Sequence, residues 1–292
     1  MINIAGAFTK SHILIPYILQ NNLKGKVCVY DGIPNCKWNG GRINSLLRYP
    51  SQNSQTSQIY GISLSGSIGK DCEISKIIKA YQKLGIPVFL TFSNFEIDIN
   101  DPLGRDSLNL LNENDGVILV NENFRNFLRQ KYPHLTLIYS ITGHPNDYKE
   151  FTFKLEDKYD LIVPRFEWIF HPEFCKWANT SKYEIMLNDT CRYGCDKWNT
   201  HFQKISEINR NSSLEENMSI SELTKIQECW IKGFNPNEDS KHPCMDMKVD
   251  AIRLALRLGY KHFKFTGREN EDSDFLYDLN LYIQRLKDSN TL

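Results

Sequence analysis

The chain has 292 residues, of which 41 % are apolar and 24 % charged, and its 35 basic and 35 acidic side chains cancel. This is the composition of a globular protein, and zero net charge gives no support to bulk binding of nucleic acid or of an anionic membrane. No apolar run reaches the roughly 18 residues of a membrane span, and the N-terminus lacks the cleavage site of a signal peptide. A cytoplasmic location is expected, where the eight cysteines are thiols or metal ligands rather than disulfides.

Short runs rich in β-branched and aromatic residues alternate along the chain with longer amphipathic runs. Most of the short runs are apolar throughout, as in parallel strands that are buried on both faces. Eight strands are predicted: Lys26–Asp31, Gln58–Leu64, Pro87–Phe92, Gly116–Val120, Thr136–Ser140, Tyr159–Val163, Tyr183–Leu187 and His262–Phe265.

Helical patterns occupy much of the sequence between these strands. Apolar side chains recur at helical spacing in Glu73–Leu84, Asn121–Tyr132, Met245–Leu258 and Asp274–Leu286. Alternating strands and helices favour right-handed crossovers and a parallel sheet. We therefore predict that residues 1–292 form a single (β/α)8 TIM-like barrel. An open doubly wound sheet is the alternative, although no Gly-x-Gly-x-x-Gly follows the first predicted strand.

A barrel places its active site at the C-terminal ends of its strands. Arg165 follows the sixth predicted strand, and Lys264, Gly267 and Arg268 lie in or just after the eighth. The backbone at Gly267 together with Arg268 predicts an anion site. Alternatively, Arg268 pairs with an acidic residue such as Asp31 or Glu269. Lys264 alternates with two phenylalanines, so either the lysine points into the barrel or the phenylalanines do.

The loop after the first predicted strand, Tyr30–Arg42, is dense in glycine, proline, asparagine and aromatic residues. Gly40 and Gly41 would let the backbone approach a ligand closely, and Arg42 would bind a carboxylate or phosphate. The alternative is a well-structured loop that closes the mouth of the barrel.

Four cysteines in the C-terminal half predict a metal centre. Cys191 and Cys195 follow the seventh predicted strand, where thiols are poorly placed for packing and well placed to bind a ligand. Cys195 and Cys229 are separated by 33 residues, and Cys229 and Cys244 by 14. The four cysteines would form a cysteine-bearing insertion of about residues 191–244 at the C-terminal mouth of strand 7.

Four thiolates hold either an iron–sulfur cluster or Zn²⁺. The spacing is not that of a zinc ribbon, which favours iron and sulfide. Trp198 occupies the position that a third cysteine of a radical-SAM motif would need. A radical-SAM cluster is therefore not expected. An iron–sulfur cluster is favoured, with zinc as the alternative. Buried thiols without a metal are the third possibility, since free cysteine is among the most buried residue types.

Other side chains could replace a ligand. Cys36 and Cys175 are candidates, whereas Cys28 and Cys72 are expected to be unliganded thiols. His201 and His242 flank the cysteine loops, and mixed Cys/His ligation is common for zinc; a position beside the ligands is the preferred interpretation for both.

No serine-hydrolase, zincin or P-loop sequence is present. The run Ala255–Arg268, with Tyr277, Tyr282 and Arg285 after it, resembles the ending of the collagenase-like U-type peptidase superfamily. The cysteines after the seventh strand resemble that superfamily's cysteine-bearing segment. The similarity covers mainly residues 159–288, and the loop Tyr30–Arg42 is similar in kind to the first loop of small members.

This resemblance implies a barrel with a [4Fe-4S] centre held by Cys191, Cys195, Cys229 and Cys244. It also implies a relation to oxidoreductases that carry out oxygen-independent hydroxylation of a quinone precursor or of RNA bases. Thr266 stands where the superfamily motif has glutamate, which removes that acid. The superfamily's peptidase label has no peptidase machinery to support it in this sequence.

The expected function is an iron–sulfur barrel enzyme that hydroxylates, or otherwise redox-modifies, an anionic or aromatic small molecule or an RNA base. The expected substrate-binding residues are Arg42, Arg165, Lys264, Gly267 and Arg268. One alternative is a zinc-stabilised, peptidase-like barrel hydrolase. Another is a non-catalytic, cluster-carrying partner that forms a hetero-complex with a related barrel protein.

Overall fold

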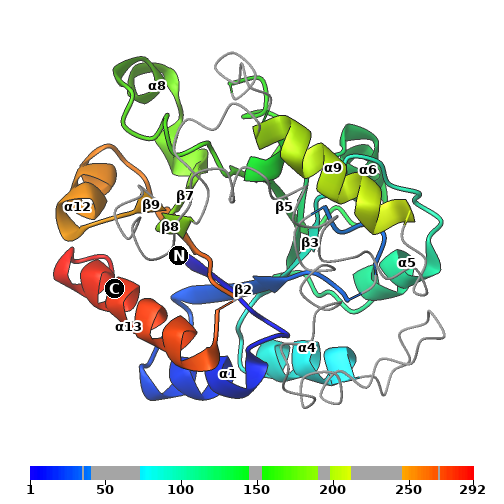
Figure 1. The fold of residues 1–292 in the computed structure, drawn as a ribbon, viewed down its shortest axis with the longest axis horizontal. Helices are drawn as coiled ribbons and strands as arrows, with labels where there is room; N and C mark the ends of the chain where they lie inside the picture. Colours follow the sequence, from blue (N-terminus) through cyan, green and yellow to red (C-terminus); the bar gives the residue numbers. More distant parts are fainter. Residues whose placement is uncertain (35, 41–72, 145–152, 190–197, 212–244, 269) are drawn as a thin grey trace, which may run out of the picture.

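The computed structural model describes residues 1–34, 36–40, 73–144, 153–189, 198–211, 245–268 and 270–292. Within these ranges, parallel strands surround a common centre and helices lie outside them (Figure 1). The strands are β1 (Ile2–Ala5), β2 (Val27–Asp31), β3 (Val88–Phe92), β4 (Gly116–Leu119), β5 (Thr136–Tyr139), β6 (Leu161–Ile162), β7 (Glu184–Met186) and β10 (His262–Phe265).

The strand order is β6-β5-β4-β3-β2-β1-β10-β7, and every pair of neighbours is parallel. A further parallel bridge between Ile162 and Tyr183 joins the two outer strands, β6 and β7. The eight strands therefore close into a barrel, which confirms the predicted single (β/α)8 fold.

The first strand of the barrel is β1, which the sequence analysis did not predict. It pairs with β2 on one side and with β10 on the other, in the registers Ile2↔Val27 and Ile2↔Phe263. The eight strands are complete without the predicted strand Gln58–Leu64, which lies outside the described residues. A strand of four residues that includes the polar Asn3 gives little signal in an apolar profile.

The described helices are connected to the strands in the alternating order of a barrel. They are α1 (Ser11–Gln20), α4 (Glu73–Lys83), α5 (Pro102–Leu108), α6 (Glu122–Lys131), α8 (Pro172–Trp177), α9 (Trp198–Asn211), α12 (Val249–Arg257) and α13 (Asp272–Asp288), with 3-10 turns η1 (Ile141–Gly143) and η2 (Thr180–Lys182).

Two predicted helix boundaries are explained by local chemistry. Asn121 does not belong to α6 but caps it, because its side-chain oxygen accepts from the N–H of Phe124 at 2.8 Å. The helix predicted from Met245 begins only at Val249. Its first two residues instead form β9 (Met245–Asp246), which pairs antiparallel with β8 (Asn188–Asp189).

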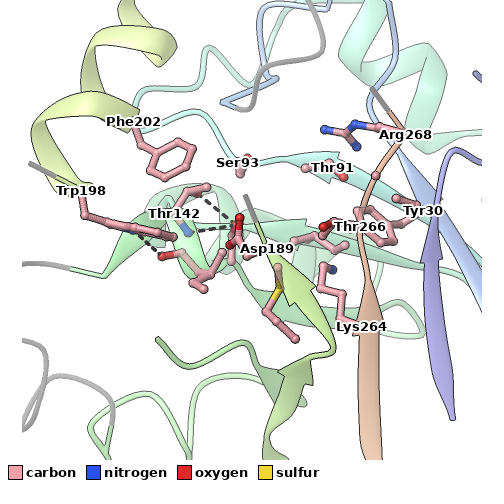
Figure 2. Close-up of a pocket in the computed structure, with 16 residues that line it drawn as sticks. Tyr30, Thr91, Ser93, Thr142, Asp189, Trp198, Phe202, Lys264, Thr266 and Arg268 are labelled. Atoms are coloured by element: carbon pink, nitrogen blue, oxygen red, sulfur yellow. Dashed lines mark hydrogen bonds between the residues drawn. The ribbon is translucent and has the colours of Figure 1, made fainter. Parts of the chain in front are cut away.

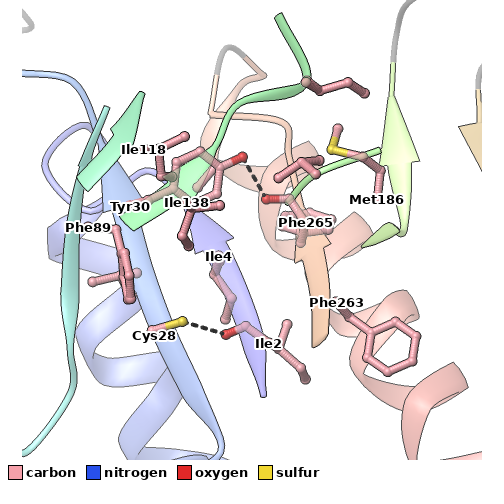
Figure 3. Packing of buried hydrophobic residues seen from close by; sticks show 14 of the residues in the cluster. Ile2, Ile4, Cys28, Tyr30, Phe89, Ile118, Ile138, Met186, Phe263 and Phe265 are labelled. Atoms are coloured by element: carbon pink, nitrogen blue, oxygen red, sulfur yellow. Dashed lines mark hydrogen bonds between the residues drawn. The ribbon is translucent and has the colours of Figure 1, made fainter. Parts of the chain in front are cut away.

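The main core lies between the barrel and its helices. On β10, Phe263 and Phe265 are fully buried and point outward, and the Phe265 ring lies 5.6 Å from that of Phe275 on α13 (Figure 3). Since side chains alternate along a strand, Lys264 between them points into the barrel. In the part of the chain that the structure describes, no helix has the length and apolar character needed to cross a bilayer.

We predict that Ile4→Ala lowers the free energy of unfolding by about 3 kcal/mol, because it leaves a cavity beside a fully buried strand. Chemical denaturation measures the change. Leu19→Ala on α1 is the control, because Leu19 is exposed and should cost well under 1 kcal/mol. Equal losses in the two variants would contradict a central position for β1.

Candidate functional site

A cavity of about 120 Å³ lies at the C-terminal ends of the strands, where a barrel of this type has its active site. Its walls come from residues in or next to strands β1, β2, β3, β4, β7, β8 and β10, the turn η1 and the first two turns of α9 (Figure 2). Its lining residues are Ala5, Tyr30, Thr91, Ser93, Ile118, Ser140, Ile141, Thr142, Met186, Asp189, Trp198, Phe202, Lys264, Thr266, Gly267 and Arg268.

Lys264 lines this cavity from β10 and is itself buried. Its ammonium nitrogen lies 3.2 Å from a carboxylate oxygen of Glu184 on β7 and 3.8 Å from the centre of the Tyr30 ring. Burial lowers the pKa of Lys264, and the Glu184 carboxylate opposes that shift. Of the two orientations considered from the sequence, the structure has the lysine inside.

Arg268 also lines the cavity, but its guanidinium pairs with Asp31 at 3.2 Å. The other oxygen of Asp31 accepts from the backbone N–H groups of Phe8 and Thr9. This pairing is the alternative that the sequence left open for Arg268. Gly267, beside it, lines the cavity with φ of +122°, a conformation that favours glycine.

Arg165 lies beside the cavity rather than on its wall. The side chain is 4 % exposed, pairs with Glu167 at 2.8 Å, and places its guanidinium 5.1 Å from the centre of the Trp198 ring. Arg165 therefore contacts Trp198, which lines the cavity, and does not itself reach the cavity. Arg42 lies outside the described residues.

Helix α9 contributes an aromatic wall that the sequence analysis did not identify. Trp198 and Phe202 are four residues apart, so both lie on one face of the helix, and both line the cavity. The indole N–H of Trp198 donates to the carbonyl of Ile141 at 3.1 Å. This bond ties the first turn of α9 to the loop after β5. The signal in the sequence was the Trp-x-x-x-Phe spacing.

The other end of α9 is held by asparagine side chains. Asn94, after β3, donates to the carbonyls of Ser206 on α9 and Asn39 in the loop after β2. Asn209 on α9 donates to the same Asn39 carbonyl at 2.9 Å. The helix is therefore fixed over the barrel mouth at both ends.

Gly40 approaches protein backbone rather than a ligand. A Cβ atom at this position would lie 1.8 Å from the carbonyl oxygen of Ser93. Residues 36–40 of this loop thus pack onto the end of β3. This is the contact expected if the loop closes the mouth of the barrel. Gly41 lies outside the described residues.

Two hydroxyl groups, on β3 and just past its C-terminal end, face the cavity without a hydrogen-bond partner among the described residues. Thr91 is 9 % exposed and Ser93 is 1 % exposed, and both line the cavity. Buried polar groups are normally paired, so hydroxyls that are unpaired within the described residues mark points where a ligand or water could bind at the cavity wall. Alternation places the two side chains on one face of the strand.

The four predicted metal ligands, Cys191, Cys195, Cys229 and Cys244, lie outside the described residues. Described residues close to them in sequence are at the cavity: Asp189 and Trp198 line it. Met245 pairs with Asp189 across β8 and β9.

The described cysteines lie elsewhere. Cys28 points into the barrel below the cavity and donates to the Ile2 carbonyl (Figure 3). Cys36 is fully buried, which raises its pKa, and Cys175 donates to the Ile169 carbonyl. None of the three lines the cavity. Within the described ranges, no group of three or more His, Cys, Asp or Glu side chains is arranged to hold a metal ion. Cys72 lies outside those ranges.

Two described histidines, His201 and His144, are buried. His201 on α9 is buried and stacks on Phe202, with ring centres 5.2 Å apart. His242 lies outside the described residues. His144, after η1, is fully buried, and its Nε2 bonds the carbonyl of Val163 at 2.8 Å. Burial, with a smaller effect of the Arg165 cation, lowers the pKa of His144 to about 4.

Neither a protein-family model nor a curated protein matches this chain. Among solved structures, that of the U32 peptidase Mk0906 is similar, with a TM-score of 0.38 and 12 % sequence identity over 67 % of this chain and 75 % of that chain. A TM-score below 0.5 does not establish a common function, so the function is inferred from the residues of the site.

We predict that the fold loses stability on acidification because of His144. Its pKa is about 4 in the folded state against 6.5 for an unperturbed histidine, so the unfolded chain binds more protons between these values. Stability should therefore fall by about 3 kcal/mol as the pH drops from 6.5 to 4. His144→Gln should remove that part of the pH dependence, as measured by urea denaturation. His134→Gln, at an exposed position, is the control and should keep the wild-type profile, and identical profiles for wild type and His144→Gln would contradict the assignment.

Proposed function

We propose that this protein is an iron–sulfur barrel enzyme that redox-modifies a small aromatic or heteroaromatic substrate, in a reaction of the oxygen-independent hydroxylation class. The observation that carries the proposal is the cavity at the barrel mouth, with an aromatic wall on one side and unpaired hydroxyls on another. A free phenolic compound and an RNA base both belong to this substrate class.

The size and lining of the cavity support a single ring. Its volume of about 120 Å³ is comparable to an engineered cavity of about 150 Å³ that binds benzene. Trp198, Phe202 and Tyr30 offer ring faces or edges. Thr91 and Ser93 would donate to, or accept from, a polar substituent of the ring.

The charges at the site support an aromatic substrate over a strongly anionic one. Lys264 and Arg268 are the cations on the described cavity wall, and each is already paired, with Glu184 and Asp31. A ligand carboxylate would therefore compete with two protein carboxylates. A neutral ring with one or two oxygen substituents meets no such competition.

The four cysteines supply the donor set that a [4Fe-4S] cluster requires, four thiolates. Two described residues support their position near the substrate: Asp189, two residues before Cys191, and Trp198, three residues after Cys195, both line the cavity. When bound, such a cluster supplies the electron transfer. The described residues would bind and orient the ring and exclude water from it.

We predict about four irons and four acid-labile sulfides per chain in protein purified without oxygen. Cys191→Ala should lose the iron and the brown absorbance, because it removes one thiolate ligand. Cys175→Ser is the matched control and should keep both, since its thiol bonds Ile169 rather than lining the cavity.

The metal analysis also separates the alternatives. One zinc without sulfide would contradict the redox proposal and support a zinc-stabilised barrel hydrolase. A full cluster in a chain that is active only together with a related barrel protein would favour the non-catalytic partner.

We predict that Thr91→Val and Ser93→Ala each weaken the binding of phenol and of uracil about five- to tenfold, because each removes one hydrogen bond worth about 1 kcal/mol. Ligand-observed NMR measures the dissociation constants. Ser75→Ala is the control, since the Ser75 hydroxyl is also buried and unpaired but belongs to α4, away from the cavity. Wild-type affinity in both cavity variants would rule out these hydroxyls as ligand contacts.

A further inference from the structure

The inside of this barrel carries charge where barrels are normally filled with branched apolar side chains. Glu184 on β7 is 2 % exposed and Lys264 on β10 is 6 % exposed, and the two form an ion pair at 3.2 Å. Asn3 on β1 is fully buried beside them in register with Lys264, and neither polar atom of its amide has a hydrogen-bond partner among the residues that the structure describes.

Stability does not explain this pair well. Taking two charges out of water costs several kcal/mol per ion, and well-packed apolar residues of similar size are often as stable or more so. One member of the pair also lies at the cavity. Lys264 reaches the cavity wall, and Glu184, behind it, does not. The cation that meets the cavity therefore has a carboxylate within hydrogen-bond distance on the protein side.

A buried lysine with a carboxylate partner is suited to nucleophilic chemistry. Desolvation favours the neutral amine, which is the nucleophile, and lysine shifts its pKa readily on burial. The Tyr30 ring at 3.8 Å, the Cys28 thiol on β2 and the neighbouring Arg268 at the end of β10 are further groups near the ammonium. The pKa of Lys264 is lowered, in the direction that such chemistry requires.

We propose that Lys264 is a nucleophile that forms an imine with a small aldehyde or ketone bound in the cavity, with Glu184 as its proton-transfer partner. This inference rests on the proposed function only in taking the cavity as the substrate site, and within the aromatic substrate class it selects rings that carry an aldehyde or ketone group. It makes no use of the cluster.

The step balances within these two side chains. Glu184 accepts a proton from the Lys264 ammonium, and the nitrogen lone pair attacks the carbonyl carbon while the C=O π electrons move to oxygen. A second nitrogen proton transfers to that oxygen and gives a carbinolamine. Glu184 then returns its proton to the hydroxyl, which leaves as water. The products are a protonated imine on Lys264, one water molecule and the original Glu184 carboxylate.

The test is reductive trapping on the full-length protein. Wild-type protein is incubated at neutral pH with about one equivalent of glycolaldehyde and with sodium cyanoborohydride, which reduces an imine to a stable secondary amine. Peptide mass spectrometry then locates the adducts. Non-specific alkylation follows exposure, so a buried lysine would be modified last unless the cavity activates it.

Lys10 is the internal control. Its side chain is 10 % exposed, as buried as that of Lys264, and it pairs with Asp272 at 2.6 Å, but it does not line the cavity. We expect at least about tenfold more adduct on Lys264 than on Lys10, because of the two only Lys264 faces the cavity that would hold the aldehyde. Adducts on exposed lysines with Lys264 unmodified would overturn the proposal.

Lys264→Arg gives a second measurement, because it keeps a cation opposite Glu184 but cannot form an imine. The variant should lose the early adduct while its exposed lysines react as before, and an unchanged early phase would overturn the proposal. Metal and sulfide analysis of the same preparations separates the two ideas. Trapping without a cluster contradicts only the redox function, and a cluster without trapping contradicts only the imine.

Discussion

The carboxylate of Asp31 joins the chain at the C-terminal ends of three neighbouring strands. It is fully buried at the end of β2, accepts two backbone N–H groups and the hydroxyl of Thr9 after β1, and pairs with Arg268 after β10. A buried carboxylate is stable only when its oxygens are satisfied in this way. The segments that follow β1 and β10 share this one acceptor at the end of β2, and this fixes the shape of the cavity on that side.

The side chains inside the barrel differ in polarity from those that face the helices. Outward side chains such as Phe265 follow the ordinary packing of strand on helix, while the inward ones near β1, β7 and β10 include Asn3, Glu184 and Lys264. Such an interior gains less from the hydrophobic effect than an apolar one, and the Glu184–Lys264 ion pair offsets only part of that loss. The lining of the cavity is then a continuation of the barrel interior, and the chemistry available to a ligand is determined by residues that also decide how the strands pack.

The alternation of apolar strands and amphipathic helices was sufficient to predict the barrel, because each strand buries both faces and shows it over a few residues. Strand β1 was not predicted, since one of its four residues is polar. Lys264 and Arg268 could be placed at the barrel mouth because strand ends are recognisable in sequence. The pairing of Arg268 with Asp31 stayed open, since 237 residues separate them. Trp198 and Thr91 were missed because only the packing of α9 across the mouth brings their walls together.

The position of β1 has a consequence for synthesis of the chain on the ribosome. The amino group of Met1 donates to the carbonyl of Lys261, 260 residues further along, and β1 is paired on both sides. At about 5 to 20 residues per second, β10 emerges some 13 to 52 s after β1. During that interval one edge of β1 has no strand to pair with, and exposed strand edges associate with other chains. The seam between β1 and β10 is thus where nascent chains are most open to misassembly, and where a chaperone would have most to protect.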